Sequence, residues 1–330
     1  MGRANRRDVL REEEIENEFF KLRIYNFGAS VGELIYKGQS VVTSFYDKID
    51  YVCETEPYLC AMVGPTAGRI SGGKYKDQGK VVKLSLNDAP NHLHGGETGI
   101  SEDYFTLRVV NDHQIECTLE CSHEEDGYPS GNFKYKINYI LDGEKLIIES
   151  HCEVPKRTLL NMTWHAYFNF SSMREDILDY TLKIKASKRT RTDVKGHPNA
   201  IVPIEKGDAF DFNDGPVYGD NFKKGSEEFK HTLGYDHALI LDDNKIELFD
   251  PKSKIGLEIE TDQEAVVVYG ANWFKEDIKY QDENHGTENS CVALEVQQIP
   301  NAVNLEGCKA KFYDENNPYY QKTTYRFFKK

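Results

Sequence analysis

The stretch from Phe133 to Ser150 alternates apolar and polar residues on both sides of a tight turn. Its first half places an apolar residue at every second position: Phe133, Tyr135, Ile137, Tyr139 and Leu141. Asp142-Gly143-Glu144 follows, and an Asp-Gly pair between alternating runs is a strong signal for a β-hairpin. Similar short runs rich in Val, Ile, Tyr, Phe and Thr recur from Phe19 onward, separated by clusters of Gly, Asn and Asp. This spacing predicts an all-β fold, either a sandwich or a barrel.

The chain shows no internal division. A length of 330 residues allows one large all-β domain or two ordinary ones. No linker rich in Pro, Gly or Ser interrupts the strand pattern, so we expect residues 16–330 to form a single domain. The start of the chain is dense in charge, and we expect a loose arm or a short helix over residues 1–15.

The acidic balance and the scattered cysteines limit the classes of partner and compartment. A formal net charge of −14 disfavours a nucleic-acid partner, because binding to phosphates requires a basic surface. No apolar run follows the charged start, and none approaches the roughly 20 residues of a membrane-spanning helix. We therefore expect neither a signal peptide nor a membrane segment. Seven cysteines, an odd number without regular spacing, indicate free thiols in the cytoplasm.

The segment Asn161–Phe170 also reads with a period of two. One set of positions is apolar: Met162, Trp164, Ala166, Phe168 and Phe170. The other set carries hydrogen-bonding groups: Thr163, His165, Tyr167 and Asn169. A strand sends alternate side chains to opposite faces, so one face suits a packed core and the other a pocket wall. Trp164 is therefore assigned to the core.

A second segment, Val292–Gln297, has the same form. Val292, Leu294 and Val296 share one face, and Glu295 lies on the other. We expect His165 and Glu295 to face each other across a pocket. On a sheet with one solvated face, Glu295 could instead point to water.

Two loops carry further candidates. Gly64–Lys74 is dense in glycine and presents Arg69, but it is not a phosphate-binding loop because Tyr75 follows Gly73-Lys74. The alternative is a turn with a solvated arginine. His92 and His94 are two residues apart, a spacing that a metal could use, although no third ligand is apparent nearby. The interpretation we favour places His94, which precedes two glycines, at a pocket rim.

An acidic residue opens another apolar strand. Asp236 stands between Tyr235 and His237, directly before Ala238-Leu239-Ile240-Leu241. It could cap the strand entry, or it could face the same pocket as His165.

Taken in order, these segments resemble the aldose 1-epimerases, also called galactose mutarotases, from about Tyr36 to Phe328. The matching pieces are Gly68–Ile70, His92–Gly96, Gly127–Gly131, Asn161–Phe170, Tyr235–His237, Leu294–Gln297, Pro300–Asn304 and Thr324–Phe327. The resemblance implies a large antiparallel β-sandwich, the galactose mutarotase-like supersandwich, with few short helices and an open cleft on one curved sheet. It also implies no metal and no organic cofactor.

The resemblance further implies the reaction, which is the interconversion of the α and β anomers of a free aldose by acid–base ring opening and closure. By position, Glu295 is the general base and His165 the general acid. Arg69, His94 and Asp236 bind and orient the sugar. His92 and Asn272 are weaker candidates for sugar contacts. The expected partner is a monosaccharide, and the protein is expected to be a monomer or homodimer.

Three positions depart from the family pattern, which leaves the preference for a particular sugar open. Gly68 and Trp164 stand where the family often has Asn, and Val267 stands where many members have Gln. The substrate could instead be a pentose, a deoxy sugar or a sugar phosphate. A non-catalytic sugar-binding protein would tend to lose Glu295 or His165, and both are present. A glycosidase-like hydrolase could use two carboxylates, but its histidines would then be idle.

Overall fold

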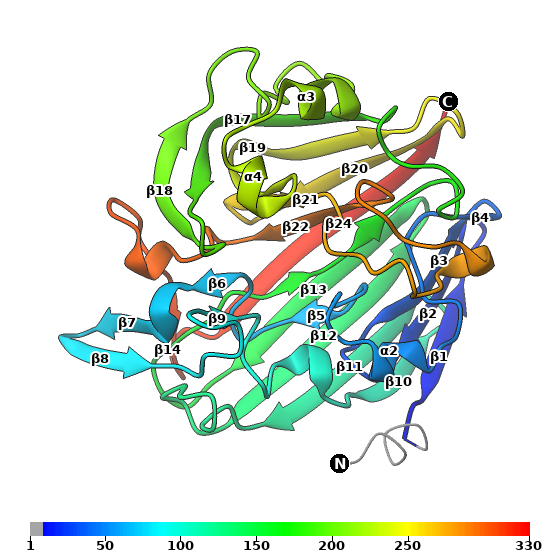
Figure 1. Ribbon diagram of the computed structural model, residues 1–330. Helices are drawn as coiled ribbons and strands as arrows, with labels where there is room; N and C mark the ends of the chain where they lie inside the picture. The colour runs from blue at the N-terminus through cyan, green and yellow to red at the C-terminus, as the bar shows by residue number, and fades with distance from the viewer. Residues whose placement is uncertain (1–8) are drawn as a thin grey trace.

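Strands dominate the computed structural model, which describes residues 9–330 (Figure 1). One antiparallel sheet contains twelve strands. Its main path runs through β10 (Thr106–Asn111), β11 (Gln114–Cys121), β12 (Phe133–Asp142), β13 (Lys145–Glu153), β24 (Tyr319–Lys329), β20 (Ile255–Thr261), β19 (Asp236–Phe249), β21 (Ala265–Tyr269), β22 (Val292–Gln297) and β16 (Tyr167–Phe168). β17 (Thr181–Thr192) pairs with β19 and with β18 (Pro198–Pro203).

Smaller elements lie against this sheet. A second sheet contains β1 (Glu12–Glu16), β2 (Phe20–Tyr25), β3 (Val31–Tyr36) and β4 (Gln39–Ser40). Four strand pairs are separate: β5 (Met62–Val63) with β15 (Thr163–Trp164), β6 (Arg69–Ile70) with β9 (His92–Leu93), β7 (Lys74–Asp77) with β8 (Lys80–Lys83), and β14 (Thr158–Leu159) with β23 (Phe312–Tyr313). The α-helices of the described residues are short: α2 (Asp50–Cys53), α3 (Tyr218–Lys224) and α4 (Phe229–Thr232).

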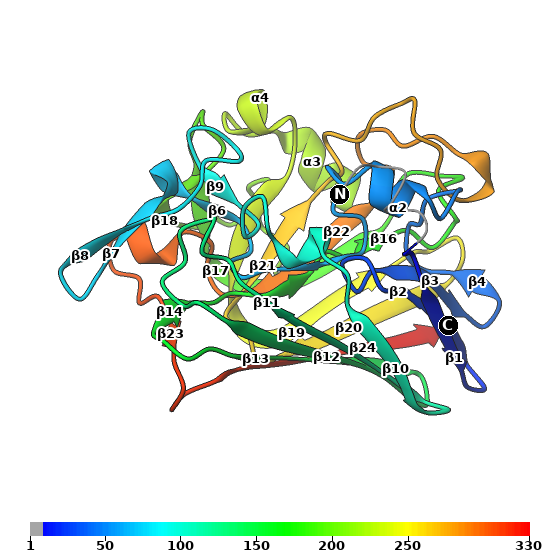
Figure 2. The ribbon, with the colours of Figure 1, turned by 90° about the horizontal axis from the view of Figure 1, so that it is seen from below.

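The arrangement is layered. Figure 2 shows the large sheet as a curved layer, with β6, β9 and the three helices on one side of it. This confirms the predicted all-β sandwich with few short helices. Across residues 9–330, none of the helices has the length and apolar character needed to span a bilayer.

The predicted hairpin is present. Asp142 pairs with Lys145 across the turn, and Gly143 adopts a φ of 57°, a left-handed conformation that glycine adopts at little cost. The alternating apolar side chains of β12 are all buried. The alternation in the sequence therefore predicts both the extent of β12 and the face that it buries.

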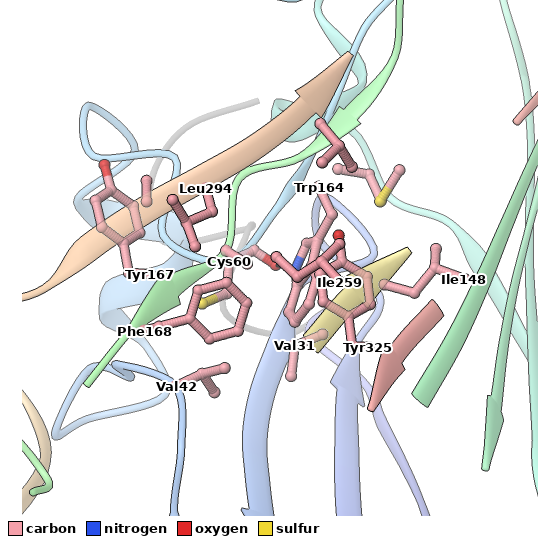
Figure 3. Packing of buried hydrophobic residues seen from close by; sticks show 14 of the residues in the cluster. Val31, Val42, Cys60, Ile148, Trp164, Tyr167, Phe168, Ile259, Leu294 and Tyr325 are labelled. Carbon is pink, nitrogen blue, oxygen red and sulfur yellow. Dashed lines mark hydrogen bonds between the residues drawn. The ribbon is translucent and has the colours of Figure 1, made fainter. Parts of the chain in front are cut away.

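Trp164 lies in the core, as predicted. Only 2% of it is exposed, and its ring meets that of Tyr325 edge-on with centroids 5.0 Å apart. Its indole nitrogen donates to the Cys60 carbonyl at 2.9 Å, which satisfies its single polar group. Figure 3 shows Trp164 among the buried residues of the core, and its ring also meets that of Phe168 edge-on, with centroids 6.0 Å apart.

The prediction of a charged arm is wrong for its last residues. Glu12–Glu16 forms β1 and pairs with β2, which places Ile15 opposite Leu22 in the buried layer. The flanking glutamates face outward, and Glu14 accepts a hydrogen bond from Arg23 at 2.9 Å. One apolar residue and charged partners across the ladder are enough to hold this strand. Residues 1–8 lie outside the described residues.

A buried ion cluster fixes the start of β19. Glu228, just before α4, accepts from Arg189 at 2.7 Å and from the Thr192 amide at 2.6 Å, and it lies 3.2 Å from His237. Burial by itself raises the pKa of Glu228, but the hydrogen bonds from His237, Arg189 and Thr192 outweigh it and lower the pKa to about 2. The carboxylate therefore ties β17 and β19 together beside Asp236.

Glu228→Ala should lower the free energy of unfolding by about 3–5 kcal/mol, because it leaves Arg189 buried without its partner. Glu227→Ala is the matched control: its side chain is 87% exposed in a surface pair with Lys230, so its loss should cost less than about 1 kcal/mol. Urea denaturation measures both. The contribution of Glu228 should be present above pH 4.5, its ordinary pKa, and lost as the pH falls toward 2. Equal costs for the two variants would contradict this account.

Candidate active site

A cavity of about 390 Å³ brings together five of the residues singled out in the sequence. They come from distant segments: Arg69 of β6, His94 after β9, His165 between β15 and β16, Asp236 at the start of β19, and Glu295 of β22. Long-range strand pairing supplies this convergence, since β22 lies between β21 and β16.

The segment around His165 is a broken strand rather than a continuous one. Thr163–Trp164 pairs with β5, whereas Tyr167–Phe168 pairs with β22. At the break, the His165 amide donates to the Ala61 carbonyl at 2.9 Å. The alternation of faces survives, but only His165 and Tyr167 of the polar set reach the cavity.

The other two polar residues of that set bond to the backbone instead. Thr163 donates to the Val296 carbonyl at 3.0 Å, and Asn169 donates to the Ser290 carbonyl at 2.7 Å. They were expected on the pocket wall and instead tie the broken strand to the β22 region.

His165 and Glu295 form a buried pair at the cavity. His165 Nε2 lies 3.4 Å from Glu295 Oε1, and each side chain is 5% exposed. Burial, helped by the charge of Asp236, raises the pKa of Glu295 to about 8. Burial also lowers the pKa of His165 to about 4. Both shifts favour the neutral form, as expected for groups withdrawn from water.

Gln297 orients the Glu295 carboxylate and was missed as a site residue. Its Nε2 donates to Glu295 Oε2 at 3.2 Å, while its Oε1 accepts from Asn161 at 3.0 Å. The donor from Asn161 fixes which end of the amide faces Glu295. The available signal was position, because Gln297 is two residues after Glu295 and so shares its face of the strand.

Arg69 lies between two carboxylates. Its Nε donates to Asp88 Oδ2 at 2.7 Å, and its Nη1 donates to Asp236 Oδ2 at 3.4 Å. Asp236 is thus held at the cavity rather than used as a strand cap. Asp88 also lines the cavity, and nothing in the local sequence pattern marked it.

His94 is placed by an unusual backbone. Its φ is +51°, and Gly95 and Gly96 also have positive φ values. A Cβ at Gly95 would lie 2.1 Å from the Gly64 carbonyl oxygen, so only glycine fits there. The Gly68 amide donates to His94 Nδ1 at 3.3 Å, and burial lowers the pKa of His94 well below its ordinary value. His94 is therefore neutral, with its proton on Nε2.

Aromatic rings complete the floor of the cavity. The Tyr58 ring lies 4.5 Å from that of His94 and 6.0 Å from that of His165, between centroids. Tyr167 packs beside His165 with centroids 4.9 Å apart. Trp273 also lines the cavity and is 59% exposed.

The two weaker candidates lie outside the lining of the cavity. His92 shares a hydrogen bond of 2.9 Å between Nε2 and the Tyr128 hydroxyl, so it supports the loop that carries His94. Asn272 donates to the carbonyls of Thr232 and Tyr235, both at 2.9 Å, and so holds the turn before Asp236. Within residues 9–330, no group of three or more His, Cys, Asp or Glu side chains is arranged to hold a metal ion.

The three departures from the family pattern differ in their surroundings. Gly68 and Val267 line the cavity, and Val267 pairs with Glu295 in the sheet. Trp164 is buried in the core on the opposite face from His165. Only two of the three therefore bear on what the cavity holds.

Glu295→Gln should stabilise the protein, and the gain should grow as the pH rises from about 5 to 8. The unfolded carboxyl loses its proton above 4.5, whereas the folded one keeps it up to about 8, so the parent loses roughly 1 kcal/mol per pH unit in this window. Thermal unfolding at several pH values measures the difference. Glu258→Gln is the control: its hydrogen bond with Arg326 lowers the pKa of Glu258, so this substitution should destabilise above pH 4.5.

Comparison with known proteins places this chain in a family. A family model described as aldose 1-epimerase matches residues 13–326. Galactose mutarotase of Sus scrofa is 30% identical over 302 residues, covering 88% of this chain and 86% of that protein. Aldose 1-epimerase of Haemophilus influenzae is 29% identical over 291 residues, covering 85% and 84%.

The fold agrees with these matches. The crystal structure of galactose 1-epimerase from Lactobacillus acidophilus superimposes with a TM-score of 0.86 at 26% identity, covering 97% of this chain and 95% of that one. The resemblance noted in the sequence is confirmed over nearly its whole length. The chain belongs to the aldose 1-epimerase family, a family of isomerases.

Proposed function

We propose that the protein is an aldose 1-epimerase that interconverts the α and β anomers of a free hexose, with Glu295 as general base and His165 as general acid. The observation that carries this proposal is the buried pair at the cavity, with 3.4 Å between His165 Nε2 and Glu295 Oε1. A proton acceptor and a proton donor side by side in the cavity wall can each reach one of two neighbouring sugar oxygens, the C1 hydroxyl and the ring oxygen.

Ring opening requires two proton transfers. The base takes the proton of the C1 hydroxyl, and the acid gives a proton to the ring oxygen as its bond to C1 breaks. Rotation about the C1–C2 bond then presents the other face of the aldehyde, and the reverse transfers close the ring. The pair needs one proton in total, which is on His165 before opening and on Glu295 while the chain is open.

The surroundings of the pair favour the second of these states. Burial raises the pKa of Glu295 and lowers that of His165, so the carboxylate is a strong base and the imidazolium a strong acid. The transfer from the C1 hydroxyl to Glu295 and the transfer from His165 to the ring oxygen are therefore both more favourable than with the same groups in water. The same shifts place the proton of the resting pair on Glu295, so opening starts once that proton has moved to His165.

Three further residues are suited to bind the sugar. Asp236 can accept from hydroxyl groups, Arg69 can donate to a hydroxyl or ring oxygen, and neutral His94 can donate from Nε2. Hydrogen bonds to neighbouring groups hold these three side chains in place before a sugar binds, so less conformational entropy is lost on binding. Gln297 and Asn161 do the same for Glu295.

The alternatives fit this cavity less well. A hydrolase that used Asp236 and Glu295 would leave both cavity histidines without a role, and Asp236 is engaged by Arg69. A binding protein would not need a buried acid–base pair, which costs stability. We also propose a cytoplasmic location, in keeping with seven cysteines that are all free thiols.

Glu295→Gln and His165→Asn should each reduce turnover by at least about 100-fold, because each removes one of the two proton transfers. Saturation-transfer NMR on glucose, galactose, xylose, arabinose and fucose measures the exchange between anomers. Glu258→Gln and His151→Asn make the same changes outside the cavity and should leave exchange near the parent rate. Near-normal turnover in either cavity variant, with the fold intact, would contradict the roles proposed for Glu295 and His165.

The pH dependence of kcat/KM should be bell-shaped, with limbs near pH 4 and pH 8. Below about 4 the pair acquires a second proton, and above about 8 it loses its only one, so neither state can complete both transfers. Exchange rates corrected for the reaction without enzyme, from pH 3.5 to 9.5, provide the profile. A flat profile over that range would exclude a pair that works with a single proton.

A further inference from the structure

The cationic groups of the cavity are already occupied. Arg69 donates to Asp88 at 2.7 Å and to Asp236 at 3.4 Å, so its charge is shared between two carboxylates. Lys275, at the mouth, lies 2.5 Å from Glu56. No other Lys or Arg of the described residues lines the cavity.

The balance of charge is therefore negative. Four carboxyl groups line the cavity, and burial holds that of Glu295 neutral, which leaves the charges of Glu56, Asp88 and Asp236 against two basic side chains. The two cavity histidines add no positive charge, because burial lowers the pKa of both below the ordinary value. A ligand with a negative substituent meets carboxylates here and no free cation.

Asp88 is the carboxylate that completes the neutralisation of Arg69. Its backbone is fixed by reciprocal hydrogen bonds with Asn91, at 3.2 and 2.7 Å, and Asn91 is anchored to the Lys195 carbonyl at 2.9 Å. Its Oδ2 accepts from Arg69, and its Oδ1 has no hydrogen-bond partner among residues 9–330. The side chain is 35% exposed, so Oδ1 can accept from a ligand in the cavity.

We propose that Asp88 determines the charge selectivity of this cavity, so that it accepts uncharged or cationic aldoses and rejects sugar phosphates and uronic acids. Asp88 does this by preventing Arg69 from acting as an anion-binding group, the role for which a free guanidinium is well suited. The inference rests on the proposed function for the reaction and narrows the class of its substrate. It also removes the sugar phosphate from the alternatives left open by the sequence.

The test compares two ligands of nearly equal size, glucuronate and its uncharged amide, glucuronamide. The parent should process glucuronamide with a kcat/KM at least about tenfold above that for glucuronate, because only the latter brings a like charge to the carboxylates. Asp88→Asn should reduce this ratio to about threefold or less, because Arg69 then has one carboxylate partner. Added salt should narrow the ratio in the parent, which steric exclusion would not do.

Asp77→Asn is the matched control. Asp77 accepts from Arg157 Nε at 3.1 Å, so it has the same chemistry as Asp88 outside the cavity, and its substitution should leave the ratio unchanged. If no sugar is turned over, calorimetry measures the affinities of both ligands for the parent and for Asp88→Asn, and the ratio of affinities replaces the ratio of kcat/KM values. Absence of exchange with every neutral sugar would overturn the proposed reaction, while the binding ratio still decides the selectivity. Equal handling of the two ligands by the parent, or an unchanged ratio in Asp88→Asn, would overturn the inference about Asp88.

Discussion

The withdrawal of Glu295 from water is the constraint on which the rest of the site depends. A carboxyl group with a pKa near 8 exists only where the fold excludes solvent and surrounds the group with other chain. β22 provides this because strands flank it on both sides and all six of its residues are buried. The large sheet therefore does more than present Glu295: it supplies the low-dielectric surroundings that make the group a strong base, and the same burial acts on His165.

Much of this site could be predicted from the sequence because strand alternation is a local property. A period of two places His165 opposite the apolar face of Trp164, and Glu295 opposite that of Leu294, whatever the partner strands are. The same reasoning placed Trp164 in the core. Arg69, His94 and Asp236 were identified through the resemblance to the aldose 1-epimerases, and the structure brings all three to the cavity.

The parts that were missed depend on contacts between distant segments. Asp88 reaches Arg69 from the loop before β9, which pairs with β6, and no pattern around Asp88 predicts that pairing. The break in the strand at His165 arises because its two halves pair with different partners. β1 was expected as a loose arm, since its one buried residue gives too little apolar periodicity to outweigh its charges. His92 and Asn272 support loops next to the cavity, a role that sequence spacing does not separate from direct contact.

The convergence of five segments on one cavity also has a kinetic meaning. Arg69 and Glu295 are separated by more than two hundred positions, and they line one cavity only when β6 and β22 are both in place. Topologies built on such non-local pairing fold slowly, and individual hairpins such as β12–β13 can form much earlier. A partly folded chain can thus contain most of its strands and still have no catalytic activity. Recovery of catalysis during refolding is consequently a stricter report of native topology than recovery of strand content.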